Sequence, residues 1–207
     1  MYRKEIILIG GGGHCRSCID VIESVQEFKI AGIVEQPGKT KSILGYPVLG
    51  SDKDLENLKN IYEYALITIG QMGSSMLRQK IFNHLKKLGF ALPVMVSSLA
   101  HVSRYASLGE GTIVMHQAMV NVGASIGRNC ILNTKCLVEH DAKIGDHTHI
   151  STGAVLNGET MIGSGSFVGS NATIVQGARF PDNLFFKAGS LVCSERDGQA
   201  MKENHGF

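Results

Sequence analysis

The 207-residue sequence predicts a small α/β domain followed by a parallel β-helix built from six-residue repeats. Two observations predict the β-helix: an aliphatic residue or Phe stands at every sixth position from Val102 to Val192, and small residues follow most of these anchors four positions later. A helix repeats at about 3.6 residues and a half-buried strand at about 2, so neither explains a period of six. The third observation is an alternation of strand and helix patterns before residue 97, which predicts the α/β domain.

Strand and helix patterns alternate through the first domain, residues 1–96. Three buried strands are expected, at 5–9, 29–34 and 64–69. Apolar residues from Ile19 to Val25 have the spacing of a helix between the first two strands. Ser74 or Ser75 can cap a further helix that runs to Leu88, and Gly89 is its expected stop. Strands and helices in this order favour a small parallel sheet.

The turn after the first strand, Gly10–Gly13, is rich in glycine and is followed by His14. Free N–H groups and the helix dipole at such a turn attract phosphate. The turn lacks the third glycine of a dinucleotide fingerprint and the sheet is short, so a mononucleotide or nucleotide-sugar is favoured over NAD. Glu35, at the end of the second strand, is placed like a ribose-binding carboxylate. A tight turn without a ligand is the structural alternative.

The β-helix prediction rests on two tracks of side chains that keep one register. The large anchors are Val102, Leu108, Val114, Val120, Ile126, Leu132, Val138, Ile144, Ile150, Leu156, Ile162, Val168, Ile174, Phe180, Phe186 and Val192. Corner patterns recur every 18 residues, with Gly or Asn at 111, 129, 165 and 183, where a positive φ is expected. Because 18 is three times six, each turn of the coil has three faces. The second domain is expected at 97–195, with a polar tail at 196–207.

Charge and hydropathy exclude several partners. The net charge of +2 contains no block of Lys or Arg, so neither nucleic acid nor an anionic membrane is expected as a partner. The first apolar run, Ile6–Ile9, is too short for a signal peptide or a membrane span. We therefore expect a cytoplasmic protein.

A metal site of the γ-carbonic-anhydrase kind is not favoured. Ligands stacked on such a coil should be separated by whole turns, and no two of the coil histidines lie 18 or 36 residues apart. These are His101, His116, His140, His147 and His149. Cys15 and Cys18 form a CxxC without the second pair that zinc requires, so packing on a helix face is favoured over a zinc or redox site.

The segment Glu139-His140-Asp141 is the strongest candidate for chemistry, because a corner side chain points outward and the core does not need it. A carboxylate that accepts a hydrogen bond from one imidazole nitrogen leaves the other as a base near neutral pH. Gly158, one turn later, would let a substrate approach and could offer its N–H to an oxyanion. His149 lies half a turn away. A solvated corner histidine is the alternative left open.

These motifs together resemble the NeuD/PglD-type sugar acyltransferases, which are nucleotide-sugar N-acetyltransferases and sialic acid O-acetyltransferases. The resemblance covers both domains. It rests on Ile6–His14, Ile67–Gly70 with the following Arg78–Ile81, Leu132–Thr134, Glu139–Asp141, Ile144–Asp146 and His149. It implies a Rossmann-like α/β domain followed by a left-handed parallel β-helix, and a homotrimer that binds acetyl-CoA between neighbouring coils. The chain lacks the Gly-x-Pro-Ala-Lys turn that often follows the last coil in this family.

The resemblance also implies roles for individual residues. His140 is the general base, and Asp141 orients and polarises its ring. The acceptor would be bound by Asn133 and Glu139 at the sugar and by Gly12, Gly13, His14, Glu35 and Gly70 at the nucleotide. Acetyl-CoA would be bound by His149, Gly158, Ala172, Ala188 and Gly189, with Gly158 as the oxyanion donor.

The implied reaction is N-acetylation of the amine of a nucleotide-linked amino sugar, of the 4-amino-4,6-dideoxy type, with acetyl-CoA as co-substrate and no metal. Two alternatives stay open. One is an O-acetyltransferase that acts on sialic acid or another sugar hydroxyl, since it would need the same base and the same thioester cleft. The other is a non-catalytic trimer that binds a nucleotide-sugar.

Overall fold

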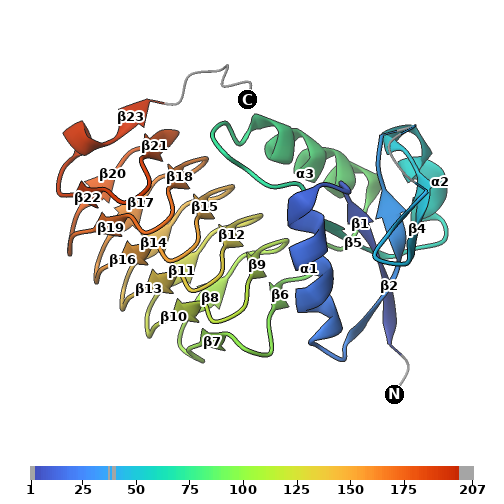
Figure 1. The fold of residues 1–207 in the computed structure, drawn as a ribbon, viewed down its shortest axis with the longest axis horizontal. Helices are drawn as coiled ribbons and strands as arrows, with labels where there is room; N and C mark the ends of the chain where they lie inside the picture. Colours follow the sequence, from blue (N-terminus) through green and yellow to red (C-terminus); the bar gives the residue numbers. More distant parts are fainter. Residues whose placement is uncertain (1–2, 37, 39–40, 201–207) are drawn as a thin grey trace.

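A computed structural model describes residues 3–36, 38 and 41–200 and contains two parts packed side by side (Figure 1). The α/β part has a five-stranded sheet in the order β3-β4-β2-β1-β5. Its strands are β1 (Lys4–Ile9), β2 (Phe28–Val34), β3 (Ser42–Ile43), β4 (Tyr46–Gly50) and β5 (Tyr64–Ile67). The central strand β1 is parallel to both β2 and β5, as predicted, and only β3 runs antiparallel to its neighbour.

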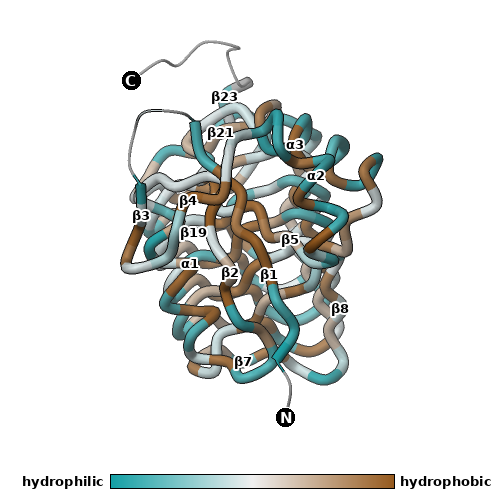
Figure 2. Tube along the Cα trace, turned by 90° about the vertical axis from the view of Figure 1, so that its right-hand side faces the viewer, coloured by the Kyte–Doolittle hydropathy of each residue, from teal (hydrophilic) through white to brown (hydrophobic). Residues whose placement is uncertain are grey.

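Helices cover both faces of this sheet because residues alternate across β1. Ile6 and Leu8 pack against α1 (Gly13–Glu23), whereas Ile7 and Ile9 pack against α2 (Leu55–Lys59) and α3 (Met76–Leu88). Figure 2 shows the hydrophobic residues concentrated along β1 at the centre of this part. The helix α3 ends where predicted, since Gly89 adopts a left-handed φ of 87°.

The α/β part differs from its sequence prediction in detail. The strand expected at 64–69 ends at Ile67, and the helix expected to reach Val25 ends at Glu23. The hairpin β3–β4, the single 3₁₀ turn Asp52–Asp54 and α2 were not predicted, because segments of two to five residues are too short to show a period. No helix among the described residues has both the length and the hydropathy needed to cross a membrane.

The second part is a three-faced coil, as the 18-residue repeat predicts. We call its faces the domain-covered face, the apolar face and the third face. The domain-covered face contains β6 (Met95–Val96), β9 (Ile113–Val114), β12 (Ile131–Leu132), β15 (His149–Ile150), β18 (Phe167–Val168), β21 (Leu184–Phe186) and β23 (Gln199–Ala200). The apolar face contains β7 (His101–Val102), β10 (Met119–Val120), β13 (Leu137–Val138), β16 (Val155–Leu156), β19 (Thr173–Ile174) and β22 (Leu191–Val192). The third face contains β8 (Ser107–Leu108), β11 (Ser125–Ile126), β14 (Lys143–Ile144), β17 (Met161–Ile162) and β20 (Arg179–Phe180).

Successive turns pair in parallel with an offset of 18 residues, for example Met119 with Leu137. The predicted anchors form the interior, and those from Val114 to Val192 are buried. The predicted corners also have positive φ, with 72° at Gly111, 53° at Asn129, 71° at Gly165 and 60° at Asn183. The strand β6, which lies within the predicted first domain, pairs with β9 and is the first strand of the coil.

The end of the coil carries the predicted polar tail. A 3₁₀ turn, Glu195–Asp197, precedes β23, which runs antiparallel to β21 and closes the domain-covered face. Residues 201–207 of the predicted tail lie outside the described residues.

The outward side chains make the three faces different. On the domain-covered face, Met95, Ile113 and Ile131 are buried against α1. The apolar face presents Met119, Leu137, Val155 and Leu191, of which Leu191 is 65% exposed. The third face presents mostly polar residues. One hydrophobic face of the coil is therefore covered by the α/β part and a second is left open.

Candidate active site

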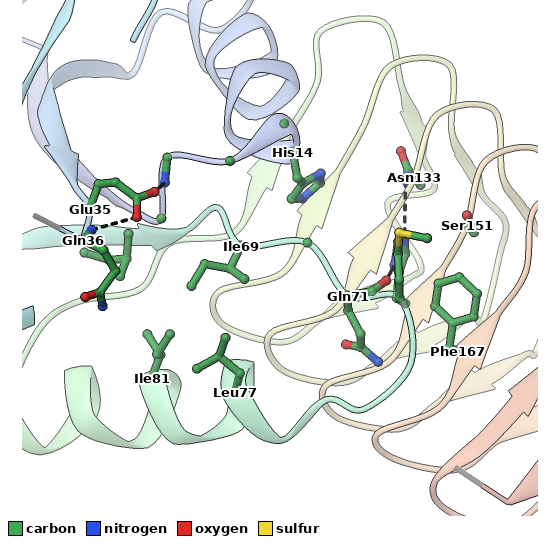
Figure 3. Close-up of a pocket in the computed structure, with 18 of the residues that line it drawn as sticks. His14, Glu35, Gln36, Ile69, Gln71, Leu77, Ile81, Asn133, Ser151 and Phe167 are labelled. Atoms are coloured by element: carbon green, nitrogen blue, oxygen red, sulfur yellow. Dashed lines mark hydrogen bonds between the residues drawn. The ribbon is translucent and has the colours of Figure 1, made fainter. Parts of the chain in front are cut away.

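A cavity of about 1010 Å³ lies between the two parts of the chain (Figure 3). One wall consists of the loops at the carboxyl ends of β1, β2 and β5, where open α/β sheets bind ligands. The other wall is the corner that follows the domain-covered face of the coil. The lining includes eight of the residues predicted for ligand binding, namely Gly12, Gly13, His14, Glu35, Gly70, Asn133, His149 and Ala188.

The glycine-rich turn is held by Glu35. The Gly11 N–H donates to Glu35 Oε2 at 2.6 Å, and the Gln36 N–H donates to Oε1 of the same carboxylate at 2.7 Å. A Cβ at Gly11 would lie 2.4 Å from Ile43 Cδ1 and 2.9 Å from Glu35 Oε2, so a side chain here would displace one of these groups. Gly12 and Gly13 are exposed at the start of α1, and no side chain caps that end of the helix. The turn therefore offers open N–H groups to an anion, as the sequence predicts.

His149 connects the loop after β5 to the coil. Its Nδ1–H donates to the Gln71 carbonyl at 2.6 Å, and its Nε2 accepts from Asn133 Nδ2 at 3.1 Å. Burial lowers the pKa of His149 to about 4, so the ring is neutral at pH 7. Both ring nitrogens are therefore engaged, one with Gln71 and the other with Asn133.

His14 is also a neutral imidazole in the cavity wall. Burial, and secondly the positive charge of Arg78, lower its pKa to about 3. Its Cβ lies 3.3 Å from the position of a Cβ at Gly70, so the glycine allows the two segments to pack closely. Figure 3 shows His14 between the glycine-rich turn and Asn133.

Two aromatic side chains that the sequence analysis did not single out form part of the coil wall. The ring of Phe167 packs edge-on against His149 with 5.1 Å between centroids, and it stacks on Phe185 at 5.3 Å. Both stand at outward positions 18 residues apart, in the column that carries Ile113, Ile131 and His149 in earlier turns, and this spacing is the signal that could have identified them. Gln71, next to the predicted Gly70, was also missed.

The predicted catalytic residues form a second cluster, at the corner between the apolar face and the third face. His140 Nδ1–H donates to Asp141 Oδ2 at 3.0 Å, which leaves Nε2 free and raises the pKa of His140. A Cβ at Gly158 would lie 2.5 Å from Nε2, so the imidazole lies directly against this glycine. Glu139 accepts from Asn121 Nδ2 at 2.8 Å. The His140 side chain is 46% exposed, so the bases of this cluster face solvent in a single chain.

The two clusters do not meet within one chain, because a whole face of the coil separates their corners. Gly189 is exposed beside Ala188 on the cavity side. Ala172 does not reach either cluster: it is 0% exposed, since it occupies the small inward track of the coil. Its N–H donates to the Gly169 carbonyl and its carbonyl accepts from the Val155 N–H, and its acetyl-CoA contact stays a prediction.

Comparisons with known proteins agree with this architecture. Residues 5–85 match the PglD N-terminal domain, and residues 141–176 match the bacterial transferase hexapeptide family with six repeats. No curated protein sequence matches the chain.

Solved structures match both parts together. The acetyltransferase domain of PglB from Neisseria gonorrhoeae, in complex with acetyl coenzyme A, is 27% identical with a TM-score of 0.84, over 97% of this chain and 100% of that one. PerB from Caulobacter crescentus, in complex with CoA and GDP-perosamine, is 28% identical with a TM-score of 0.84, over 96% and 97% of the two chains. The perosamine N-acetyltransferase of that organism, solved as a histidine-to-asparagine variant with the same ligands, is 28% identical with a TM-score of 0.85, over 97% of each chain.

The predicted fold class is confirmed by these matches: a Rossmann-like α/β domain precedes a left-handed parallel β-helix of hexapeptide repeats. The two family models meet in one chain, and the solved relatives span it almost completely. These matches confirm that the chain resembles the NeuD/PglD-type sugar acetyltransferases.

Proposed function

We propose that this chain transfers the acetyl group of acetyl-CoA to the amine of a nucleotide-linked amino sugar, of the 4-amino-4,6-dideoxy type. The observation that carries the proposal is the pairing of His140 with Asp141 directly against Gly158. Relatives that cover nearly the whole chain support it, because one was solved with acetyl coenzyme A and another with CoA and GDP-perosamine.

His140 is the proposed general base. Its Nε2 takes a proton from the amine as the nitrogen attacks the thioester carbonyl carbon, and the C–S bond breaks as the amide forms. The proton then passes from the imidazolium to the leaving thiolate, which gives CoA thiol. Asp141 holds the tautomer that leaves Nε2 unprotonated.

Gly158 is the proposed oxyanion donor. Its N–H has no acceptor within the described part of the chain, and it lies beside the base. A backbone N–H that needs no reorganisation can stabilise the negative charge on the carbonyl oxygen during attack.

The charge around His140 favours an amine over a hydroxyl as the nucleophile. Besides Asp141, the carboxylates of Glu139 and Glu159 contribute to the raised pKa of His140, so the corner carries a negative potential. A protonated amine is attracted to this potential as it binds and must lose one proton before it attacks, whereas a neutral hydroxyl is not attracted. The N-acetyltransferase is therefore proposed ahead of the O-acetyltransferase.

A homotrimer would complete the site. The cavity and the His140 corner flank the apolar face, and that face presents Met119, Leu137, Val155 and Leu191 outward. Burying this row against a second chain removes apolar area from water, and it would bring the His140 corner of one chain toward the cavity of its neighbour. In this arrangement Glu35 and the glycine-rich turn hold the nucleotide, Asn133 faces the sugar, and Ala188 and Gly189 border the acetyl-CoA cleft.

The test is release of CoA thiol from acetyl-CoA with a panel of acceptors: UDP-, dTDP- and GDP-linked 4-amino-4,6-dideoxy sugars, and sialic acid as the hydroxyl control. Release with one nucleotide-linked amine is expected. Release with sialic acid alone would favour the O-acetyltransferase. A chain that binds neither acetyl-CoA nor any member of the panel would contradict an enzymatic function.

A further inference from the structure

A buried arginine joins the two parts of the chain behind the cavity. Arg78, on α3, is 1% exposed. Its Nη1 donates to the carbonyl of Ile67, the last residue of β5, at 3.4 Å and to the Ile69 carbonyl, just beyond the sheet, at 2.5 Å. Its Nη2 donates to Oδ1 of Asn129 at 2.6 Å and to the Asn129 carbonyl at 3.1 Å, on the coil. Arg78 therefore clamps the α/β part to one corner of the coil.

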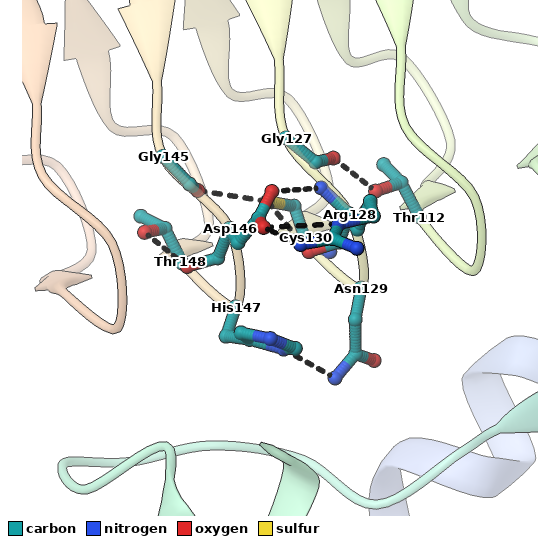
Figure 4. A network of polar contacts seen from close by, with 9 residues as sticks. All are labelled: Thr112, Gly127, Arg128, Asn129, Cys130, Gly145, Asp146, His147 and Thr148. Atoms are coloured by element: carbon teal, nitrogen blue, oxygen red, sulfur yellow. Dashed lines mark hydrogen bonds and ion pairs between the residues drawn. The ribbon is translucent and has the colours of Figure 1, made fainter. Parts of the chain in front are cut away.

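The corner that accepts the hydrogen bonds of Arg78 is held in place by further side-chain contacts. Figure 4 shows Asn129 reaching His147 one turn later, at 2.9 Å between Asn129 Nδ2 and His147 Nδ1. Beside them, Asp146 accepts from Arg128 Nη2 at 2.6 Å and so neutralises that second, half-exposed arginine. The two neighbouring arginines thus differ: Arg128 has a carboxylate partner and Arg78 bonds only to neutral oxygens.

The charge of Arg78 is not balanced by any group among the described residues. No carboxylate among the described residues pairs with it, and its Nε has no acceptor there. Burial lowers its pKa to about 10, so the guanidinium remains charged at pH 7. A buried charge without a counter-charge is costly, and neutral carbonyls reduce that cost without cancelling the charge. Its field therefore extends past the carbonyls that it holds into the space beyond them.

That space is the cavity. Ile69, whose carbonyl accepts from Arg78, lines it, and so do the adjacent Gly70 and the nearby His14. The field of Arg78 already acts there, because it contributes to the lowered pKa of His14. The open N–H groups of Gly12 and Gly13 line the same cavity. An anion at the N–H groups of Gly12 and Gly13 would lie in the same cavity as the Glu35 carboxylate that holds Gly11, and the buried charge of Arg78 behind the wall would offset that carboxylate.

We propose that Arg78 is a positioning residue whose buried, unpaired charge selects a diphosphate-linked acceptor, by acting through the cavity wall on the diphosphate without touching it. The proposal rests on the proposed function, since it assumes that the acceptor is a nucleotide-sugar. Arg78 then has two roles: its hydrogen bonds hold the two parts of the chain together, and its charge raises the affinity for phosphate.

The experiment compares dissociation constants for nucleoside and nucleoside diphosphate, using uridine with UDP, thymidine with dTDP and guanosine with GDP. The measured quantity is the dissociation constant of the nucleoside divided by that of its diphosphate, for the nucleobase that the wild-type chain binds best. Arg78→Gln and Arg78→Met both remove the charge, and each is accepted only if circular dichroism and thermal melting show a folded chain. Either should reduce the ratio about tenfold while the affinity for the nucleoside stays unchanged.

Two further variants distinguish the effect of the Arg78 charge from the effect of its hydrogen bonds to the coil. Arg78→Lys keeps the charge and should keep most of the ratio. Asn129→Gly keeps the charge and the positive φ but removes three side-chain hydrogen bonds, two to Arg78 and one to His147, so it should lower Tm and leave the ratio as in wild type.

Three outcomes would overturn the role of Arg78: a folded Arg78→Gln or Arg78→Met with the wild-type ratio, an Arg78→Lys with the ratio of Arg78→Gln, or an Asn129→Gly that loses the ratio. A wild-type chain that binds none of the three diphosphates would instead contradict the acceptor class of the proposed function.

Discussion

The imidazole of His140 leaves no room for a side chain at position 158. A Cβ there would fall 2.5 Å from His140 Nε2 and 2.6 Å from Cε1, closer than real Cβ contacts come. Because Nδ1 is engaged by Asp141, it is the free nitrogen that rests on the glycine. The base and the proposed oxyanion donor are therefore fixed relative to each other by the stacking of two coil turns, and this relationship can be tested from both sides.

Replacing His140 with Ala should lower kcat by about 10²- to 10⁴-fold, because one positioned general base contributes that much. The side chain is not part of the core, so the melting temperature should stay close to that of wild type. Thiol release and thermal melting of the same preparation check this prediction. Turnover near the wild-type rate in the variant would remove His140 from the mechanism.

The pH profile should report the contact between His140 and Asp141. Asp141 raises the pKa of His140 above its ordinary 6.5, and the base acts only when neutral, so kcat/KM should fall as the pH drops through that raised pKa. Asp141→Asn removes the charge that stabilises the imidazolium, so the acid limb should move to lower pH. The loss of kcat at pH 8 should be smaller than for His140→Ala. An acid limb that does not move would show that Asp141 does not control the base.

Gly158→Ala should act through His140. The added methyl must displace the imidazole, so kcat should fall by about 10- to 100-fold. In a His140→Ala background the clash is absent, and the same substitution should have little further effect. This double-mutant cycle is the control, since strong coupling between the two positions marks direct contact. Additive losses would mean that Gly158 contributes independently of the base.

The buried, neutral His149 should make the protein sensitive to acid. Its pKa is about 4 in the folded chain and 6.5 as its ordinary value, so the unfolded chain binds more protons below pH 6.5. Stability is therefore complete above pH 6.5 and is lost progressively as the pH falls towards 4, by about 2 kcal/mol at pH 5.

His149→Gln tests this linkage, because an amide can accept from Asn133 and donate to Gln71 without titrating. The variant should lose less stability than wild type between pH 7 and pH 5, as measured by urea unfolding at each pH. His84→Gln, at an exposed position on α3, is the matched control and should behave like wild type. Identical pH dependence in all three chains would show that His149 does not carry the effect.

The register of the coil could be predicted from sequence because it is a local property. Each turn repeats the same side-chain volumes at fixed spacing, so Val102 and Val192 follow one rule although 90 residues separate them. The hairpin β3–β4 and α2 could not be predicted, since a period cannot appear in so few residues.

The candidate site was only partly predictable, because its residues meet through tertiary contacts. Sequence pattern identified His140 and Asp141 as neighbours, and the stacking of turns brought them to Gly158. It could not show that Gln71 lies against His149, 78 residues away. For Ala172 the family resemblance alone implies an acetyl-CoA contact, and the residue is 0% exposed on the small inward track of the coil.

In the proposed trimer, each active site combines residues from two neighbouring copies of the chain. If the His140 corner of one chain completes the cavity of another, mixing His140→Ala with Asn133→Ala should restore part of the activity that each variant lacks, after unfolding and refolding together. Some interfaces of the mixed trimer would then combine an intact base with an intact cavity.

Leu137→Glu on the apolar face should abolish both assembly and activity, because a carboxylate cannot be buried there without a partner. Ser125→Glu, at an outward position of the third face, is the control and should leave the trimer intact. Sedimentation velocity gives the assembly state. If mixed trimers form but gain no activity, the His140 cluster and the cavity do not combine across two chains. That result would contradict the shared site inferred from the separation of the two corners by the apolar face.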